Sequence, residues 1–304
     1  NFTVERQMTP SLVLRSSYVG TRGNHLSIAL DEDTPYPGPG AIAPRRPYPQ
    51  YASISAWEPI GISTYHALEL SAEKRFSKGL SFMAAYTFSR SLDEGGGGNS
   101  ADAESRLNIQ DPRNVKSAYG LSDFNYPHRF TMSLMYDLPF GHGRAFLPNA
   151  NRAVDWLAGG WELSSIVTAQ DGPPGTLTMS TTTANTGTKQ YPDRVCDGNL
   201  SGSARTIEQW FQTSCFQAPA LYTWGNAGRN IMIAPGLVTW DLGAHKDFRI
   251  TERTGLTFRA EFFNFLNKPN FGYPDTSIGD PGAGSITGVA TNARQIQFAL
   301  RLHW

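Results

Sequence analysis

The chain has 304 residues, and its 26 basic side chains balance 26 acidic ones, so the formal net charge is zero and the pI is near 7.2. This balance favours neither nucleic acid nor an anionic membrane surface as a partner. Hydrophobic residues make up 39% of the chain, the mean hydropathy is −0.36, and no apolar run reaches the roughly eighteen residues of a transmembrane helix.

A low mean hydropathy is compatible with a transmembrane β-barrel, because only alternate residues of each strand face lipid. Thirty glycines, twenty prolines and 12% aromatic residues are typical of many strands separated by turns. The chain begins at Asn1 and shows neither the basic nor the apolar region of a signal peptide. We therefore expect that a signal peptide has been removed or that longer sequence lies upstream.

Alternation of apolar and polar residues with period two recurs along the chain and predicts nine strands. In His128–Leu138, for example, Phe130 and Met132 alternate with Arg129 and Thr131. The nine predicted strands are residues 2–7, 12–20, 65–76, 80–88, 128–138, 161–170, 238–250, 256–262 and 294–304.

The connections alternate between short and long. Tight turns are expected at 8–11, 77–79 and 252–255, with Gly79 and Gly255 in the left-handed conformation. A fourth link on the same side, 140–160, is longer, and we expect a short helix at about 153–158 in it. Short periplasmic turns opposite long outer loops are typical of bacterial outer-membrane barrels. The long connections are 21–62, 91–126, 171–235 and 268–292.

The last eleven residues form the clearest strand. Transmembrane strands need about 9–11 residues, whereas ordinary strands have about 5–6. The segment therefore predicts the closing strand of a barrel, which contacts lipid and the barrel-assembly machinery. Its polar face holds Gln295, Gln297, Ala299, Arg301 and His303, and its apolar face holds Ile296, Phe298, Leu300, Leu302 and Trp304.

Charges of both signs alternate with the apolar residues, as expected of the wall of a wet or plugged barrel. Nine strands is an odd number, whereas single-chain bacterial barrels have even numbers and leave no edge in lipid. Residues 1–304 are thus expected to be the C-terminal part of one barrel domain. The charges expected in the lumen are Arg15, Glu69, Glu73, Arg75, Arg129, Asp137, Glu162, Arg259, Glu261 and Arg301, and a girdle is expected from Tyr18, Tyr86, Tyr136, Trp161, Trp240 and Trp304.

The connection 171–235 is the main candidate for ligand recognition. Cys196 and Cys215 lie 19 positions apart in it and are expected to pair in an oxidising compartment, although two free thiols are the alternative. Nearby aromatic rings could stack on a sugar, a peptide or an aromatic ligand, or else pack the loop's own core, which we favour. These rings are Tyr191, Trp210, Phe211, Tyr222 and Trp224.

No catalytic or metal-binding motif is evident. The sequence contains no P-loop, G-x-S-x-G, H-E-x-x-H or C-x-x-C, and its six histidines are scattered. Asp31, Glu32 and Asp33 could hold Ca²⁺, but loop carboxylates are usually only solvated. We expect no enzyme activity, no cofactor and no resident metal.

Several strings in a fixed order resemble the C-terminal barrel of large TonB-dependent receptors of the Oar-like type, which is abundant in Acidobacteria. The resemblance covers essentially the whole chain. The strings are YVGTRG (18–23), RRPYP (45–49), YHAL (65–68), KRFSKGL (74–80), AYTFSRS (85–91), HRF (128–130), LPFG (138–141), GGW (159–161), GNAGRN (225–230), FRAEFFNFLN (258–267) and PNF (269–271).

This resemblance implies a barrel of about 22 strands, closed by an N-terminal plug, in the outer membrane of a Gram-negative bacterium. It also implies uptake of a scarce ligand, such as a carbohydrate, peptide or metal chelate, with energy delivered by TonB. The signal peptide, TonB box, plug and about 13 strands would lie upstream. An adhesin or structural barrel without active transport is the main alternative, and a small barrel enzyme is a third.

Overall fold

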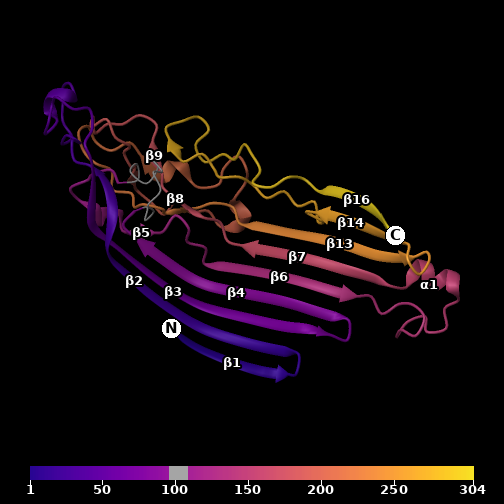
Figure 1. Ribbon diagram of the computed structural model, residues 1–304. Helices are drawn as coiled ribbons and strands as arrows, with labels where there is room; N and C mark the ends of the chain where they lie inside the picture. Colours follow the sequence, from indigo (N-terminus) through magenta and orange to yellow (C-terminus); the bar gives the residue numbers. More distant parts are fainter. Residues whose placement is uncertain (96–108) are drawn as a thin grey trace.

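A computed structural model describes residues 1–95 and 109–304 (Figure 1). The long strands are β1 (Phe2–Thr9), β2 (Leu12–Asp31), β3 (Ser55–Ser77), β4 (Leu80–Asp93), β6 (His128–Asp137), β7 (Trp161–Gln170), β13 (Leu237–Arg249), β14 (Gly255–Phe263) and β16 (Gln295–His303). The short elements are β5 (Gly120–Leu121), β8 (Pro174–Gly175), β9 (Thr178–Met179), β10 (Asp193–Arg194), β11 (Phe216–Gln217), β12 (Met232–Ile233), β15 (Ser277–Ile278), the helix α1 (Arg152–Ala158), and 3₁₀ turns at Ala43–Arg45, Val115–Ala118, Gly202–Ala204 and Thr213–Cys215.

The long strands form one antiparallel sheet in which each pairs with its neighbours along the chain. The order is β1-β2-β3-β4-β6-β7-β13-β14-β16, and β5 adds a short pairing to the end of β4. All nine predicted segments are strands of this sheet, so the all-β antiparallel prediction is confirmed. The sheet is open in the described residues, with β1 and β16 at its two edges (Figure 1).

Two details of the prediction are wrong. Strand β2 continues well beyond residue 20, and β3 begins well before residue 65. The reason is that the two strands stay paired past a bulge near Gly23. Gly255 does not adopt a left-handed conformation, whereas Gly79 does, with φ +78°. Gly255 lies at the start of β14, where a Cβ would collide with the ring of His303 on β16. Close approach of a neighbouring ring therefore explains this glycine.

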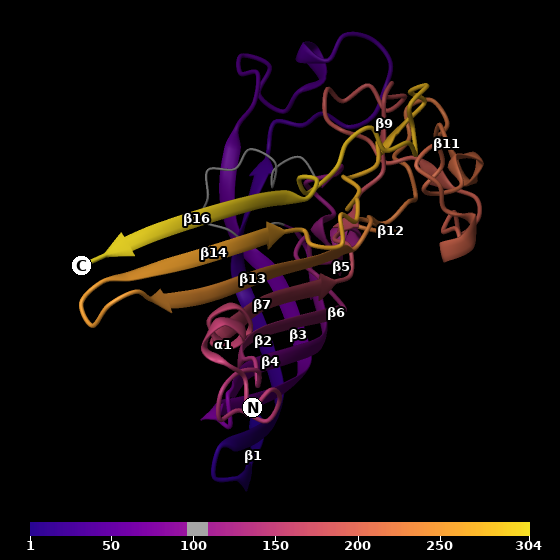
Figure 2. The same cartoon turned by 90° about the vertical axis from the view of Figure 1, so that its right-hand side faces the viewer.

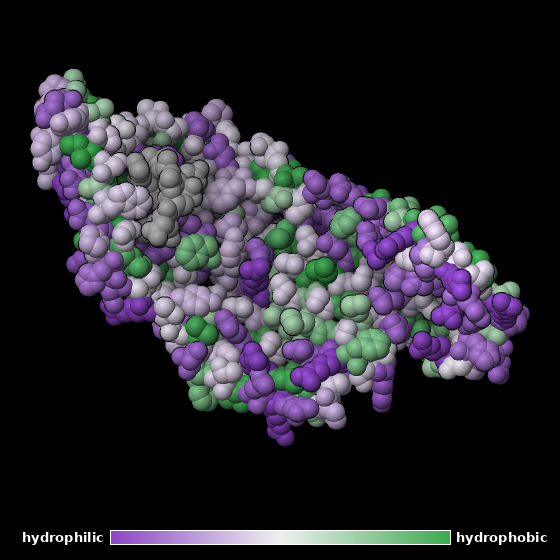
Figure 3. Space-filling view, in the orientation of Figure 1, coloured by the Kyte–Doolittle hydropathy of each residue, from purple (hydrophilic) through white to green (hydrophobic). Residues whose placement is uncertain are grey.

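The register gives the sheet an apolar outer face. Residues directly opposite each other point to the same side of an antiparallel sheet. Phe298 on β16 lies opposite Ala260 on β14, which lies opposite Ala244 on β13 and then Leu163 on β7. The side chains of β16 on this face are exposed, Phe298 by 67%. In the orientation of Figure 1, the space-filling view shows hydrophobic and hydrophilic residues interspersed along the sheet (Figure 3).

The opposite, inner face carries the charges. Arg15 on β2 forms an ion pair of 2.6 Å with Glu5 on β1. His245 on β13 lies 3.5 Å from Asp247 and 3.9 Å from Glu162. The ten charges expected in the lumen share this one face, as the strand registers show.

Tyrosines of the predicted girdle are paired with histidines on the outer face. The hydroxyl of Tyr18 lies 2.7 Å from Nδ1 of His66, and that of Tyr86 lies 2.7 Å from Nδ1 of His128. In both pairs the ring centroids are 6.1 Å apart. Each ring is thus apolar on one side and polar at its tip, as an interfacial aromatic must be.

The two ends of the sheet differ. Lys78 and Gly79 close the β3–β4 hairpin in left-handed conformations, and the predicted helix within 140–160 is α1. At the other end the long connections gather into small two-stranded sheets (Figures 1 and 2). Within 1–95 and 109–304, no helix is long and apolar enough to cross a membrane.

Candidate functional site

The long connections pack together at one end of the sheet. We call this region the loop assembly; it comprises residues 32–54, 109–127, 171–236 and 264–294. Asn185 donates to the carbonyls of Gly38 (2.9 Å) and Gly40 (2.8 Å), which joins the third connection to the first. Arg113 donates to the Thr34 carbonyl (2.8 Å) and lies over the ring of Tyr36, which joins the second connection to the first.

A buried arginine holds the centre of the assembly. The guanidinium of Arg229 is inaccessible to solvent and pairs with Asp93 at the end of β4 and with Asp123, 3.1 Å away. It also donates to the Ala118 carbonyl at 2.8 Å. Asn230, the next residue, donates to the Leu121 carbonyl at 2.7 Å. Buried charges require such partners, so this network fixes the 225–230 segment against the second connection.

The assembly has its own apolar core. Leu177, Phe211, Cys215, Phe216, Met232 and Ile278 are buried together, and Trp210 and Met179 pack against them. This cluster joins the third and fourth connections. A second cluster, formed by Ile28, Leu30, Ile109, Val115 and Ala118, joins the end of β2 to the second connection.

The five aromatic residues proposed for ligand contact differ in how far they are buried. Tyr191 and Phe211 are only 1% and 2% exposed, so they pack inside the loop, the favoured alternative for these two residues. Trp210 is half-buried and donates to the Ile233 carbonyl at 2.7 Å. Trp224 is half-buried, and Tyr222 is 42% exposed in a left-handed conformation. A ligand contact by Tyr222, Trp210 or Trp224 stays a prediction.

Tyr191 is buried in the interior of the loop assembly. Its amide donates to the side chain of Gln110 (3.1 Å), which in turn donates to the Gly225 carbonyl (2.7 Å). A Cβ on Gly225 would collide with the Tyr191 carbonyl, which explains the glycine. Burial raises the pKa of the Tyr191 hydroxyl, with smaller effects from Arg229 and Asp123. The hydroxyl is therefore neutral at physiological pH.

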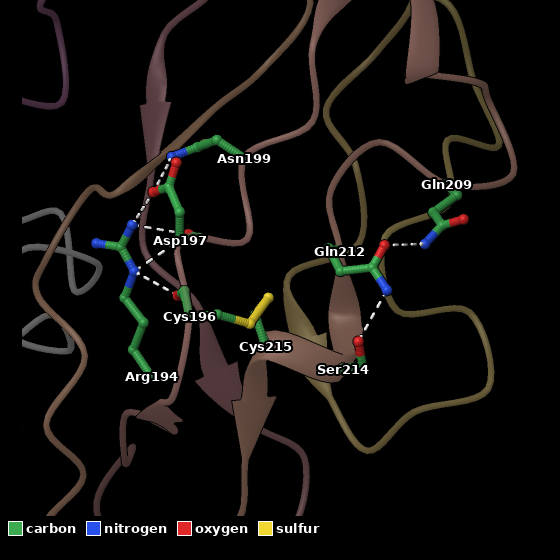
Figure 4. The surroundings of a disulfide bond; sticks show 8 residues. All are labelled: Arg194, Cys196, Asp197, Asn199, Gln209, Gln212, Ser214 and Cys215. Atoms are coloured by element: carbon green, nitrogen blue, oxygen red, sulfur yellow. Dashed lines mark hydrogen bonds and ion pairs between the residues drawn. A yellow bond between two sulfur atoms is a disulfide. The ribbon is translucent and has the colours of Figure 1, made fainter.

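The structure joins Cys196 and Cys215 in a disulfide, with their Cα atoms 4.9 Å apart, as the compartment argument predicts (Figure 4). Arg194 lies beside it and donates to the carbonyls of Cys196 (3.0 Å) and Asp197 (3.1 Å). The bond ties an exposed strip of the loop to Cys215 in the apolar core. It therefore stabilises this exposed strip against the core of the loop.

A cavity of about 290 Å³ lies where three connections meet. Its walls include Asp31 from β2, Ile109 and Pro112 from the second connection, and Thr188 and Lys189 from the third. A charge of each sign beside apolar walls is suited to a small polar ligand. Sequence reasoning missed this site because its walls come from segments far apart in the chain.

Two of the carboxylates considered for Ca²⁺ accept hydrogen bonds from backbone amides. Asp31 accepts from the amides of Asp33 (3.1 Å) and Ile54 (2.9 Å). The buried Asp33 accepts from the Tyr48 amide at 2.8 Å and lies 3.6 Å from Arg46. Because these oxygens face amides and a guanidinium, they shape the first connection. No cluster of metal-ligating side chains occurs in the described ranges.

The inner face of the sheet has a hollow of about 490 Å³, which is mostly apolar but is also lined by Glu73, Asp241 and Glu261. Met83, Met135, Ile166 and Phe263 are 42–57% exposed around it. Small residues occupy neighbouring positions and leave the space open: Ser81, Ser133, Ser164 and Gly243.

A sheet with one apolar and one charged face, tight turns at one end and packed loops at the other, defines a transmembrane β-barrel protein. The chain belongs to the outer membrane beta barrel domain family, whose model matches residues 1–297. It is therefore a protein of the bacterial outer membrane. No curated protein matches its sequence.

Two solved structures are similar to the chain. The outer membrane transporter YddB from Escherichia coli has 11% sequence identity and a TM-score of 0.48, with 99% of this chain and 31% of that chain covered. BauA, the ferric preacinetobactin receptor from Acinetobacter baumannii, has 10% identity and a TM-score of 0.41, with 99% and 28% covered. The chain thus spans about a third of the length of these proteins.

Proposed function

We propose that this barrel segment belongs to a TonB-dependent receptor of the Oar-like type, which imports a carbohydrate, a peptide or a metal chelate. The order of the strings from YVGTRG to PNF supports the receptor type. In this proposal the chain carries out no chemical reaction. Its walls and loops select the ligand, and TonB acts through a region upstream of Asn1.

The apolar hollow on the inner face is the observation that carries the proposal. An apolar patch on a charged wall is stabilised by a protein partner, whereas a water-filled channel leaves it exposed. Met83 on β4 and Ile166 on β7 lie in one row through Ser133 on β6, and Phe263 on β14 lines the same hollow. A plug domain inside the barrel would cover this row.

The test compares uptake in four strains, with and without the gene for this protein and with and without TonB. Each strain grows on a medium of mixed oligosaccharides, peptides and iron chelates, and mass spectrometry follows the loss of each solute. We expect at least one solute whose removal needs both the protein and TonB. If cells bind to surfaces through this protein while no solute depends on it, the chain is an adhesin instead.

A further inference from the structure

The helix α1 has its polar and apolar sides reversed relative to a surface helix of a soluble protein. At 100° per residue, Ala153, Val154, Trp156 and Leu157 share about half of its circumference. This apolar side faces outward, with exposures of 39% for Val154, 52% for Trp156 and 64% for Leu157. Residues of this kind are normally turned toward the protein core.

The acidic residue of the helix faces inward. Asp155 accepts a hydrogen bond of 2.6 Å from the amide of His142. A Cβ on Gly141 or Gly159 would collide with its carboxylate, so these glycines leave room for it. These glycines belong to the LPFG and GGW strings, which lie before and after the helix in the sequence.

The helix also covers a lysine on the outer face of the sheet. Lys246 on β13 is only 3% exposed, and its ammonium group donates to the Gly159 carbonyl. The same group lies 4.8 Å from the ring centre of Phe248 and 5.6 Å from that of Trp161. Trp156 packs on Phe248, with ring centroids 4.8 Å apart. The end of the helix therefore shields the charge of Lys246, which lies on the outer face of the sheet.

From these contacts we infer that α1 inserts its apolar side into the lipid interface of the leaflet that faces the short turns. Phe248, on which Trp156 packs, lies opposite Leu256, and Leu256 lies opposite Leu302 at the lower edge of the outer face. The exposed side of α1 is thus continuous with the face that contacts lipid. Helices with aromatic and aliphatic residues on one side and arginines beside them lie in membrane interfaces.

Arginines flank the apolar side, as phosphate headgroups require. Arg152 in the first turn of α1 and Arg144 in the preceding loop are both exposed. Phe146 and Leu147 in the same loop as Arg144 are also exposed, by 56% and 46%. The helix would then fix the depth of this barrel edge and keep Lys246 away from the acyl chains.

The test measures where two positions of α1 lie in a bilayer. The native full-length protein, with Leu157→Cys or Arg152→Cys, is spin-labelled and placed in vesicles of phosphatidylethanolamine and phosphatidylglycerol. Both cysteines of the present chain are in the disulfide, and the unsubstituted protein reports any labelling elsewhere. Paramagnetic resonance then compares collisions with oxygen, which enters lipid, and with a water-soluble nickel chelate. Heat-modifiable migration confirms that each variant is folded.

We expect the label at Leu157 to collide more with oxygen than with nickel, and the label at Arg152 to show the opposite preference. Equal nickel access at both positions would place the helix in water and overturn the inference. A Leu157 label shielded from both reagents would also overturn it, since a protein partner would then cover the helix. In detergent without lipid, the oxygen preference at Leu157 should persist.

Discussion

At the scale of single residues, asparagine side chains hold the loop assembly together. Asn270 accepts from the Val238 amide at 2.8 Å and donates to its carbonyl, and Asn264 donates to the carbonyls of Lys268 and Asn292. Together with Arg229, these residues lie in the FRAEFFNFLN, PNF and GNAGRN strings. The strings on which the resemblance rests therefore include residues whose side chains join separate parts of the loop assembly.

The buried guanidinium of Arg229 gives the sharpest prediction for a single residue. In Arg229→Ala, Asp93 loses its partner while buried, so the loop assembly should lose about 3–5 kcal/mol of stability. Hydrogen exchange of the loop amides measures this loss. The more accessible pair of Arg194 and Asp197, whose side chains are 31% and 73% exposed, provides the control, and Arg194→Ala should cost no more than about 1 kcal/mol. A similar small loss in both variants would contradict the role of Arg229.

The disulfide stabilises the outer strip of the third connection. Cys196 is exposed, so Cys196→Ser removes the cross-link with little change to the core. In the chain-entropy model the cross-link contributes about 3 kcal/mol. Limited proteolysis should therefore cleave 195–215 faster in the variant, and faster in the wild type after reduction. Unchanged cleavage in both would show that the core alone holds this strip.

At the scale of the strand, the two faces should tolerate charge differently. Lysine at Phe298 or Phe130 on the outer face should cost about 2–4 kcal/mol of folding free energy in lipid, because the charge enters the hydrocarbon region. Lysine at the neighbouring inner positions, Gln297 or Thr131, should cost far less. Folding titrations in lipid vesicles give both values. Equal costs would mean that the faces are assigned wrongly.

The closing strand matters for the whole molecule. β16 pairs only with β14 among the described residues, and its apolar side chains are half or more exposed. Deleting 294–304, or replacing Trp304 with a charged residue, should abolish barrel assembly in the outer membrane. The assay is heat-modifiable migration of the membrane fraction. Normal migration of either variant would remove the assembly role from this strand.

The native polypeptide should be much larger than this chain. The open sheet would leave two unpaired edges in lipid, which backbone hydrogen bonding forbids. Intact mass spectrometry of the protein from outer membranes should therefore give a mass well above 33.4 kDa. A mass near 33.4 kDa would require several chains to close one barrel.

The sequence by itself determined the nine strands, their two faces and the side of the tight turns. Period-two alternation is a local property that follows from the pleat, so it can be read without the fold. Phe298 and Arg301, for example, lie on the faces that alternation predicts. The disulfide could also be predicted, because the chain has two cysteines and an oxidising compartment favours their pairing.

Only the tertiary structure decided what the long connections do. It placed Tyr191 and Phe211 in the buried interior of a loop, formed a cavity from three connections, and brought Lys246 of β13 against Gly159 at the end of α1. It also gave Gly255 a different role from Gly79. These contacts join residues far apart in the chain, and no local periodicity reports them. Strand pattern is set by neighbours in sequence, whereas burial within loops is set by neighbours in space.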